Sequence, residues 1–98
     1  MRFEWDAGKA AANRRKHGIA FEEAMTAFDD PFALRAPDPG HSTAAEERTW
    51  LIGESDTAGT LVVVFTVRQP GDVTRLISAR LAGRKERQRY EESKGVPV

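Results

Sequence analysis

A run of five large apolar residues, Leu61 to Phe65, constrains the fold more than any other part of this sequence. A strand with such a run is apolar on both of its faces, which is typical of the centre of a sheet. From Glu47 onward, the preceding side chains alternate with the period of two that strands show. Residues 69–72 then have the composition of a turn, and residues 73–80 form the expected returning strand. This half of the chain therefore predicts an antiparallel meander of three or four strands.

The N-terminal third has the periodicity of helices instead. A short edge strand is expected at residues 3–6, and Asp6 is placed to cap a helix over residues 7–17. Gly18 is suited to end that helix, because glycine adopts positive φ readily. A second amphipathic helix is expected next, with an apolar stripe that we assign to the core and with residues 29–31 as its stop. The stripe consists of Phe21, Ala24, Met25 and Phe28.

The turn at residues 69–72 sets the register of the two strands that it joins. If its end residues pair with each other, Thr66 lies opposite Arg75. Arg68 then shares a face of the sheet with Arg75, whereas Arg80 lies on the other face. A loop longer or shorter by one residue would exchange the faces.

A last helix is expected from about Arg84 to Lys94. Tyr90 is its only large apolar side chain, so the helix lacks a core-facing stripe. It is stabilised by charge pairs along its own surface, or it docks on something outside the domain. We therefore expect residues 83–98 to form a polar tail helix that is loosely docked.

The charges of this chain are polarised although their sum is zero. From Arg75 to Arg89, six basic residues stand against the single acid Glu86, a local charge of +5. Such asymmetry points to a polyanionic ligand or an acidic partner. A solvated basic helix without a ligand is the alternative reading of the same pattern.

Length and composition suit one ordinary globular domain over residues 1–98, since 40% of the residues are apolar and 31% are charged. The chain has no cysteine, which excludes disulfides, thiol catalysis and thiolate zinc sites. With only two histidines, we expect neither a metal site nor a cofactor. No apolar run is long enough to cross a bilayer, and the N-terminus lacks the order of a signal peptide. A cytoplasmic protein without membrane contact is therefore expected.

Some polar residues suit the cleavage of RNA without a metal. That reaction needs a base for the 2′-hydroxyl, cations for the charge on the phosphorane and an acid for the leaving 5′ oxygen. Arginine stays charged and grips two phosphate oxygens at once, so Arg68, Arg75 and Arg80 are candidate phosphate clamps. Strand arginines that face solvent are also common without any function. No residue carries a clear signature of the base.

Two other residues are candidates for proton transfer. His17 is expected near the C-terminal end of a helix, where the helix dipole favours its protonated form. It then serves as an acid or a phosphate contact, or only as a capping donor to the last carbonyls. Tyr90 can stack on a base, transfer a proton or anchor its helix by packing. His41 lies in a polar loop, where we expect it to be solvated.

Taken together, the residues resemble the BrnT toxin family of bacterial type II toxin–antitoxin systems. The resemblance spans nearly the whole chain and rests on the order and spacing of short motifs. They include Phe3-x-Trp5-Asp6, Lys16-His17-Gly18, Phe21-Glu22-Glu23-Ala24, Asp30-Pro31, Glu46-Glu47-Arg48, Thr66-x-Arg68, Ile77-Ser78-Ala79-Arg80, Glu86-Arg87 and Tyr90. The chain departs from the family pattern at Thr49, which separates Trp50 from Arg48, and at Val67 and Gly83.

This resemblance implies a RelE-like α+β fold, with an N-terminal strand and two helices followed by an antiparallel sheet and a basic C-terminal helix. It also implies a ribonuclease that blocks translation and is neutralised by a small DNA-binding antitoxin, with operator DNA bound only through the antitoxin complex. On this basis, the expected catalytic residues are His17, Arg68, Arg80 and Tyr90. The expected RNA-binding residues are Lys16, Arg75, Arg84, Lys85 and Arg87.

A non-catalytic role is the alternative function. The chain would then hold an antitoxin and contribute basic surface to the recognition of operator DNA. A basic helix by itself does not distinguish RNA from DNA.

Overall fold

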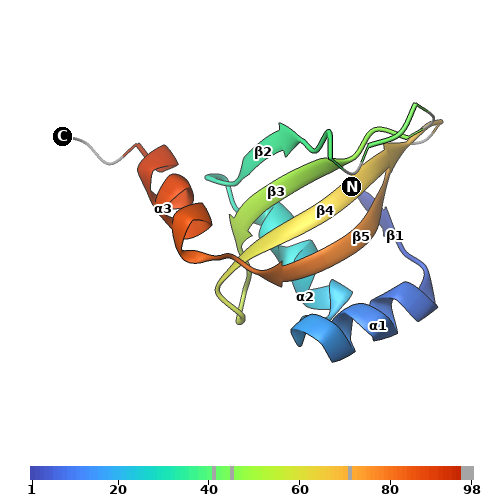
Figure 1. The fold of residues 1–98 in the computed structure, drawn as a ribbon, viewed down its shortest axis with the longest axis horizontal. Helices are drawn as coiled ribbons and strands as arrows, with labels where there is room; N and C mark the ends of the chain where they lie inside the picture. The colour runs from blue at the N-terminus through green and yellow to red at the C-terminus, as the bar shows by residue number, and fades with distance from the viewer. Residues whose placement is uncertain (41, 45, 71, 96–98) are drawn as a thin grey trace.

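The computed structural model describes residues 1–40, 42–44, 46–70 and 72–95, and it has an α+β fold (Figure 1). His41, expected to be solvated, lies outside the described residues. The strands form one sheet in the order β1-β5-β4-β3-β2, with β1 parallel to β5 and every other neighbouring pair antiparallel. The elements are β1 (Arg2–Glu4), α1 (Ala7–His17), α2 (Phe21–Thr26), the 3-10 turn η1 (Ala27–Asp29), β2 (Leu34–Pro37), β3 (Thr49–Glu54), β4 (Thr60–Arg68), β5 (Val73–Leu81) and α3 (Arg84–Ser93).

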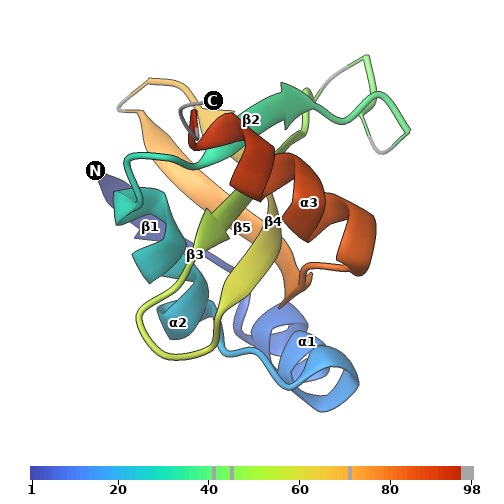
Figure 2. The ribbon, with the colours of Figure 1, turned by 90° about the vertical axis from the view of Figure 1, so that its left-hand side faces the viewer.

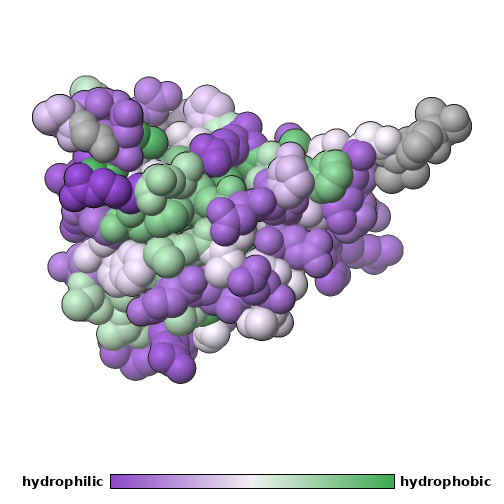
Figure 3. Space-filling model, turned by 180° about the vertical axis from the view of Figure 1, so that it is seen from behind, coloured by the Kyte–Doolittle hydropathy of each residue, from purple (hydrophilic) through white to green (hydrophobic). Residues whose placement is uncertain are grey.

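The sheet separates two apolar clusters of different size. Helices α1 and α2 lie against one face, and α3 lies at the other (Figures 1 and 2). Strand β4 contributes to both clusters, as expected of a central strand: Leu61 and Val63 belong to the large cluster and Val62 to the small one. Seen from behind, the surface mixes hydrophilic residues with smaller apolar areas (Figure 3). The buried members of the small cluster are Ile52, Val62, Ala82 and Tyr90.

The helices of the N-terminal third begin and end for the predicted reasons. The Asp6 carboxylate accepts a 2.9 Å hydrogen bond from the backbone N–H of Lys9, which caps α1. Gly18 ends α1 with a φ of 74° and donates its N–H to the Arg14 carbonyl at 2.8 Å. The stripe predicted for the second helix lies in or against the large cluster, but the helix tightens into the turn η1 after Thr26.

The register of β4 and β5 changes in the middle of the pair. Near the turn, Thr66 lies opposite Arg75, as predicted. Farther along, Phe65 pairs with Leu76 but Val64 pairs with Ser78, so one residue of β5 is left without a partner. An extra residue of this kind is a β-bulge, and it exchanges the faces of every residue beyond it.

The bulge corrects the predicted placement of Arg80. Directly opposed residues share a face of the sheet, and Arg80 lies opposite Val62. Arg68 lies on β4 at an even number of positions from Val62, so its side chain is on that same face. The prediction that Arg68 and Arg80 lie on opposite faces was therefore wrong, because it assumed a register without a bulge.

Asn13 fastens α1 to the edge of β5. Strand β1 pairs with β5 only as far as Arg75, so the backbone of Ala79 lacks a neighbouring strand on that side. The Asn13 amide accepts from the Ala79 N–H at 3.1 Å and donates to the Ala79 carbonyl at 2.8 Å. It also donates to the Ile19 carbonyl at 3.0 Å. The buried side chain thus takes the place of a strand and fixes the end of α1 that carries His17.

We expect Asn13→Ala to lower the free energy of unfolding by about 2–4 kcal/mol, because it leaves buried backbone groups of Ala79 and Ile19 without partners. Urea denaturation measures the loss. Asn13→Asp keeps the acceptor and removes the donors, so it should also destabilise. Lys9→Ala, at an exposed position of α1, is the control. An Asn13→Ala protein as stable as this control would contradict the assignment.

Candidate active site

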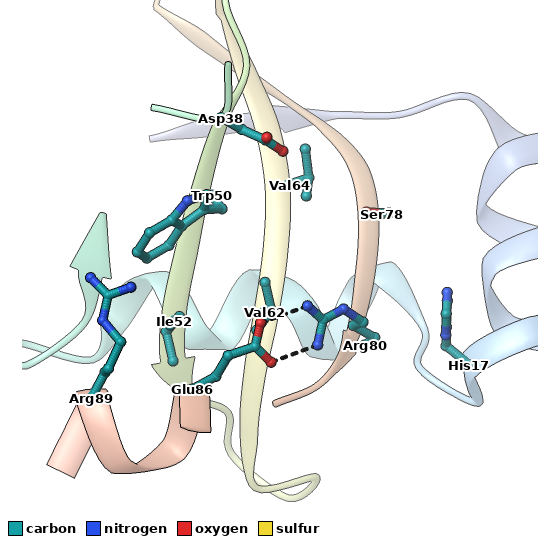
Figure 4. Close-up of a pocket in the computed structure, with 10 residues that line it drawn as sticks. All are labelled: His17, Asp38, Trp50, Ile52, Val62, Val64, Ser78, Arg80, Glu86 and Arg89. Carbon is teal, nitrogen blue, oxygen red and sulfur yellow. Dashed lines mark hydrogen bonds and ion pairs between the residues drawn. The ribbon is translucent and has the colours of Figure 1, made fainter. Parts of the chain in front are cut away.

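The face of the sheet toward α3 carries a hollow of about 490 Å³ (Figure 4). Two rows of opposed residues cross its floor: Ile52, Val62 and Arg80 form one row, and Trp50, Val64 and Ser78 form the next. The walls come from α1, the loop after β2 and α3. The lining residues are His17, Asp38, Trp50, Ile52, Val62, Val64, Ser78, Arg80, Glu86 and Arg89.

An ion pair between Arg80 and Glu86 closes one end of the hollow. The guanidinium donates from Nη1 to Oε1 and from Nη2 to Oε2 of the carboxylate, both at 2.7 Å. Oε1 also accepts from the Gly83 N–H at 2.7 Å, so the same carboxylate caps α3. The hydrogen bonds from Arg80 lower the pKa of Glu86 to about 2, against the opposing effect of partial burial. The side chains remain 42% and 32% exposed, so a ligand in the hollow has access to both.

His17 is the last residue of α1, and its side chain lines the same hollow from the α1 side, while the Arg80 guanidinium points toward Glu86 (Figure 4). A neighbouring surface depression contains both His17 and Lys16, which the sequence had placed together. Ser78 belongs to both depressions. The hollow therefore brings an imidazole, a guanidinium and a carboxylate together, with a lysine at its approach.

Tyr90, which was predicted among the catalytic residues, does not line the hollow. Its side chain is 1% exposed in the small cluster, and its hydroxyl donates to the Asp30 carboxylate. Burial, and then the contact with Asp30, raises the pKa of Tyr90. Burial opposes ionisation of Asp30 too, but hydrogen bonds from the Glu54 N–H, Tyr90 and the Phe32 N–H keep the pKa of Asp30 below its ordinary value. Tyr90 thus packs α3 against the small cluster, and both its predicted catalytic role and the loose docking expected for residues 83–98 stay predictions.

The other predicted arginines of the sheet do not line the hollow. Arg68 lies six residues along β4 from Val62, roughly 20 Å away at the rise of a strand. It borders a separate depression together with Glu46 and Glu47. Arg75 donates to the Glu4 carboxylate at 2.7 Å. These arginines thus share the face of the site without sharing its hollow.

The basic residues predicted on α3 are exposed. Arg84 and Arg87 line a shallow groove on the outer side of the helix, and Lys85 lies in the same first turn. They border the N-terminal end of α3, where Glu86 reaches into the hollow. This arrangement keeps much of the predicted positive charge next to the site.

Sequence reasoning missed several residues of the hollow. Glu86 was visible as the single acid of the basic stretch and as the third residue after Gly83, a spacing that capping boxes use. No comparable signal marked Trp50, Arg89, Asp38 and Ser78, because each comes to the hollow from a different element.

A search of the described ranges finds no cluster of three or more histidine or acidic side chains arranged to hold a metal ion. In the same ranges, every helix is too short or too polar to span a membrane.

We expect the contribution of the Arg80–Glu86 pair to stability to depend on pH. The pKa of Glu86 is about 2 in the folded protein and about 4.3 in an unfolded chain, so the stabilisation is complete above the unfolded value and is lost as pH falls through the folded one. Glu86→Gln keeps a cap for Gly83 but removes the charge. Urea denaturation should show a loss of about 1 kcal/mol at pH 7 for this partly exposed pair, shrinking between pH 4 and pH 2. A loss that is equal at both pH values would instead indicate a packing effect.

Comparison with known proteins gives one family match. No curated protein matches the chain significantly. The family model described as "Ribonuclease toxin, BrnT, of type II toxin-antitoxin system" matches residues 5–86, a span that begins in the N-terminal segment and ends at the carboxylate that pairs with Arg80. The chain therefore belongs to the BrnT family of ribonuclease toxins from type II toxin–antitoxin systems.

Proposed function

We propose that this chain is an endoribonuclease toxin that cleaves RNA without a metal ion and thereby blocks translation in the cytoplasm. Family membership supports a ribonuclease. The observation that carries the proposal is that Glu86, Arg80 and His17 line one hollow. These side chains supply a base, a fixed positive charge and an acid, which are the three requirements of the reaction.

Each residue has one step in the proposed mechanism. The Glu86 carboxylate takes the proton of the 2′-hydroxyl, and the 2′ oxygen attacks the neighbouring phosphorus. Arg80 stabilises the charge of the five-coordinate phosphorane. As the bond from phosphorus to the 5′ oxygen breaks, His17 donates a proton to that oxygen. The products are a 2′,3′-cyclic phosphate and a free 5′-hydroxyl.

The ion pair of the free protein has to open before this reaction. Arg80 holds Glu86 in a bidentate contact, and the phosphate of the substrate competes for the same two guanidinium nitrogens. When the phosphate takes them, the carboxylate loses the hydrogen bonds that hold its pKa at about 2. Its pKa then rises toward the ordinary value, which makes Glu86 a stronger base at the time when a base is needed.

The basic residues around the hollow are proposed to hold the RNA backbone. Contacts of this kind add affinity without base specificity and weaken as salt is raised. Arg68 and Arg75 lie on the same face of the sheet as the hollow but outside it. They suit contacts with RNA phosphates farther along the strand rather than with the scissile phosphate. The proposed contacts nearer the hollow are the exposed residues of its surroundings, Lys16, Arg84, Lys85 and Arg87.

A cognate antitoxin is the proposed regulator. Membership of a type II system implies a partner protein. We propose a small DNA-binding protein that covers the hollow and the basic surface of α3, so that toxin bound to it has no access to RNA. Operator DNA would be bound through that complex and not by the toxin alone.

Purified protein incubated with RNA in EDTA should cleave it and leave 2′,3′-cyclic phosphate ends, which end-mapping detects. The cognate antitoxin should stop the cleavage. If RNA stays intact while the chain still binds its antitoxin and the pair binds operator DNA, the non-catalytic alternative holds instead. Cleavage that EDTA abolishes would show that a metal ion takes part.

Replacement of Arg80 by alanine, or of Glu86 by glutamine, should each lower kcat by about 10²–10³-fold, because each removes one catalytic step. Glu92→Gln, on the exposed side of the same helix, is the matched control and should retain activity. Single-turnover cleavage separates these effects from binding. Arg68→Ala should act mainly on KM, since Arg68 lies outside the hollow. Equal kcat in the Glu86→Gln variant and the wild type would remove Glu86 from the mechanism.

A further inference from the structure

One end of the floor of the hollow is aromatic, and no step of the proposed reaction uses it. Trp50 lies on β3 between Ala36 of β2 and Val64 of β4, and its side chain is half-buried. It packs against the small apolar cluster that contains Ile52 and Val62. The indole also lines the hollow, on the side opposite Arg80 (Figure 4). The cluster thus supports the ring while part of it stays open to a ligand.

Arg89 of α3 approaches the same ring. Its guanidinium carbon is 5.7 Å from the centroid of the Trp50 ring, a cation–π distance. The Arg89 side chain is exposed, so it is free to swing outward and admit a flat ligand. Aromatic rings, the indole among them, and guanidinium planes are surfaces on which proteins stack single-stranded bases.

The distance between Trp50 and Arg80 suits one nucleotide. They are separated by two strand spacings across the sheet and two residues along it, because Trp50 is in the row of Val64 and Arg80 in the row of Val62. Strand geometry puts their Cα atoms about 12 Å apart. Both side chains are long and project from the same face toward the hollow. A nucleotide whose base stacks on Trp50 would therefore have its phosphate near Arg80.

We infer that Trp50, with Arg89 beside it, is the stacking platform for one unpaired base of the substrate, next to the phosphate that Arg80 holds. The inference rests on the proposed function, since it takes RNA as the ligand. A base inside a duplex is already stacked and paired, so the platform selects single-stranded RNA. Every base has a π face, so stacking alone gives little sequence preference.

The test compares two ligands that differ only in their bases. One is a 2′-O-methyl adenosine trinucleotide, which lacks the nucleophilic hydroxyl and is not cleaved; the other is the same backbone without bases. By calorimetry, the wild-type protein should bind the first roughly tenfold more tightly. Trp50→Ala should bind both ligands equally, because it removes the stacking partner while the phosphate contacts remain.

Two further variants separate stacking from a loss of folding. Trp50→Phe keeps an aromatic ring on the cluster and should retain part of the preference. Trp5→Phe leaves Trp50 as the only tryptophan of the chain. The ligand that carries bases should quench the fluorescence of Trp50, and the ligand without bases should not. Trp5 packs edge-on against Phe21, with ring centroids 5.8 Å apart, in the large cluster away from the hollow.

The outcomes distinguish this inference from the proposed ribonuclease. A wild-type protein without preference for the ligand with bases, or a Trp50→Ala protein that retains the full preference, overturns the stacking platform even if RNA is cleaved. A preference that depends on Trp50, in a protein that does not cleave RNA, supports the platform and refutes the ribonuclease.

Discussion

The β-bulge between β4 and β5 is the constraint on which the site depends. With the register of the turn continued unchanged, Arg80 would lie opposite Leu61, a fully buried residue of the large apolar cluster. A guanidinium there would lose its hydration without a carboxylate partner, at a high cost in free energy. The extra residue in β5 turns Arg80 to the opposite face, where Glu86 is within reach. One unpaired residue thus decides which side of the sheet carries the chemistry.

The Arg80–Glu86 pair joins the fold to the proposed reaction. Its carboxylate caps the first turn of α3, while Tyr90 contacts the small cluster and Asp30 about one turn later in the same helix. The inner face of the helix thus contacts the rest of the domain at Glu86 and at Tyr90, its single large apolar side chain. An exposed ion pair adds little to stability, and that modest strength suits a contact that a phosphate has to displace.

Ion pairs within the folded protein offset part of the local positive charge of the basic stretch. Arg75 is paired with Glu4, and Arg80 with Glu86, so two of the six basic residues in the basic stretch are balanced within the domain. The exposed positive charge that remains is concentrated on α3 and on the C-terminal end of α1. This distribution places cations beside the hollow that holds His17, Arg80 and Glu86, as a polyanionic strand requires.

Sequence alone predicted every helix and every strand except β2, because strand alternation, the helical stripe, the Asp6 cap and the Gly18 stop are local signals. It also identified Arg80 and His17 as candidates from their chemistry. Tertiary structure decided which candidates meet. Glu86 reaches Arg80 across a turn, Tyr90 finds Asp30 sixty residues away, and Trp50 comes to the hollow from another strand. These contacts depend on a bulge and on the packing of distant segments, and neither produces a periodic pattern of residues in the sequence.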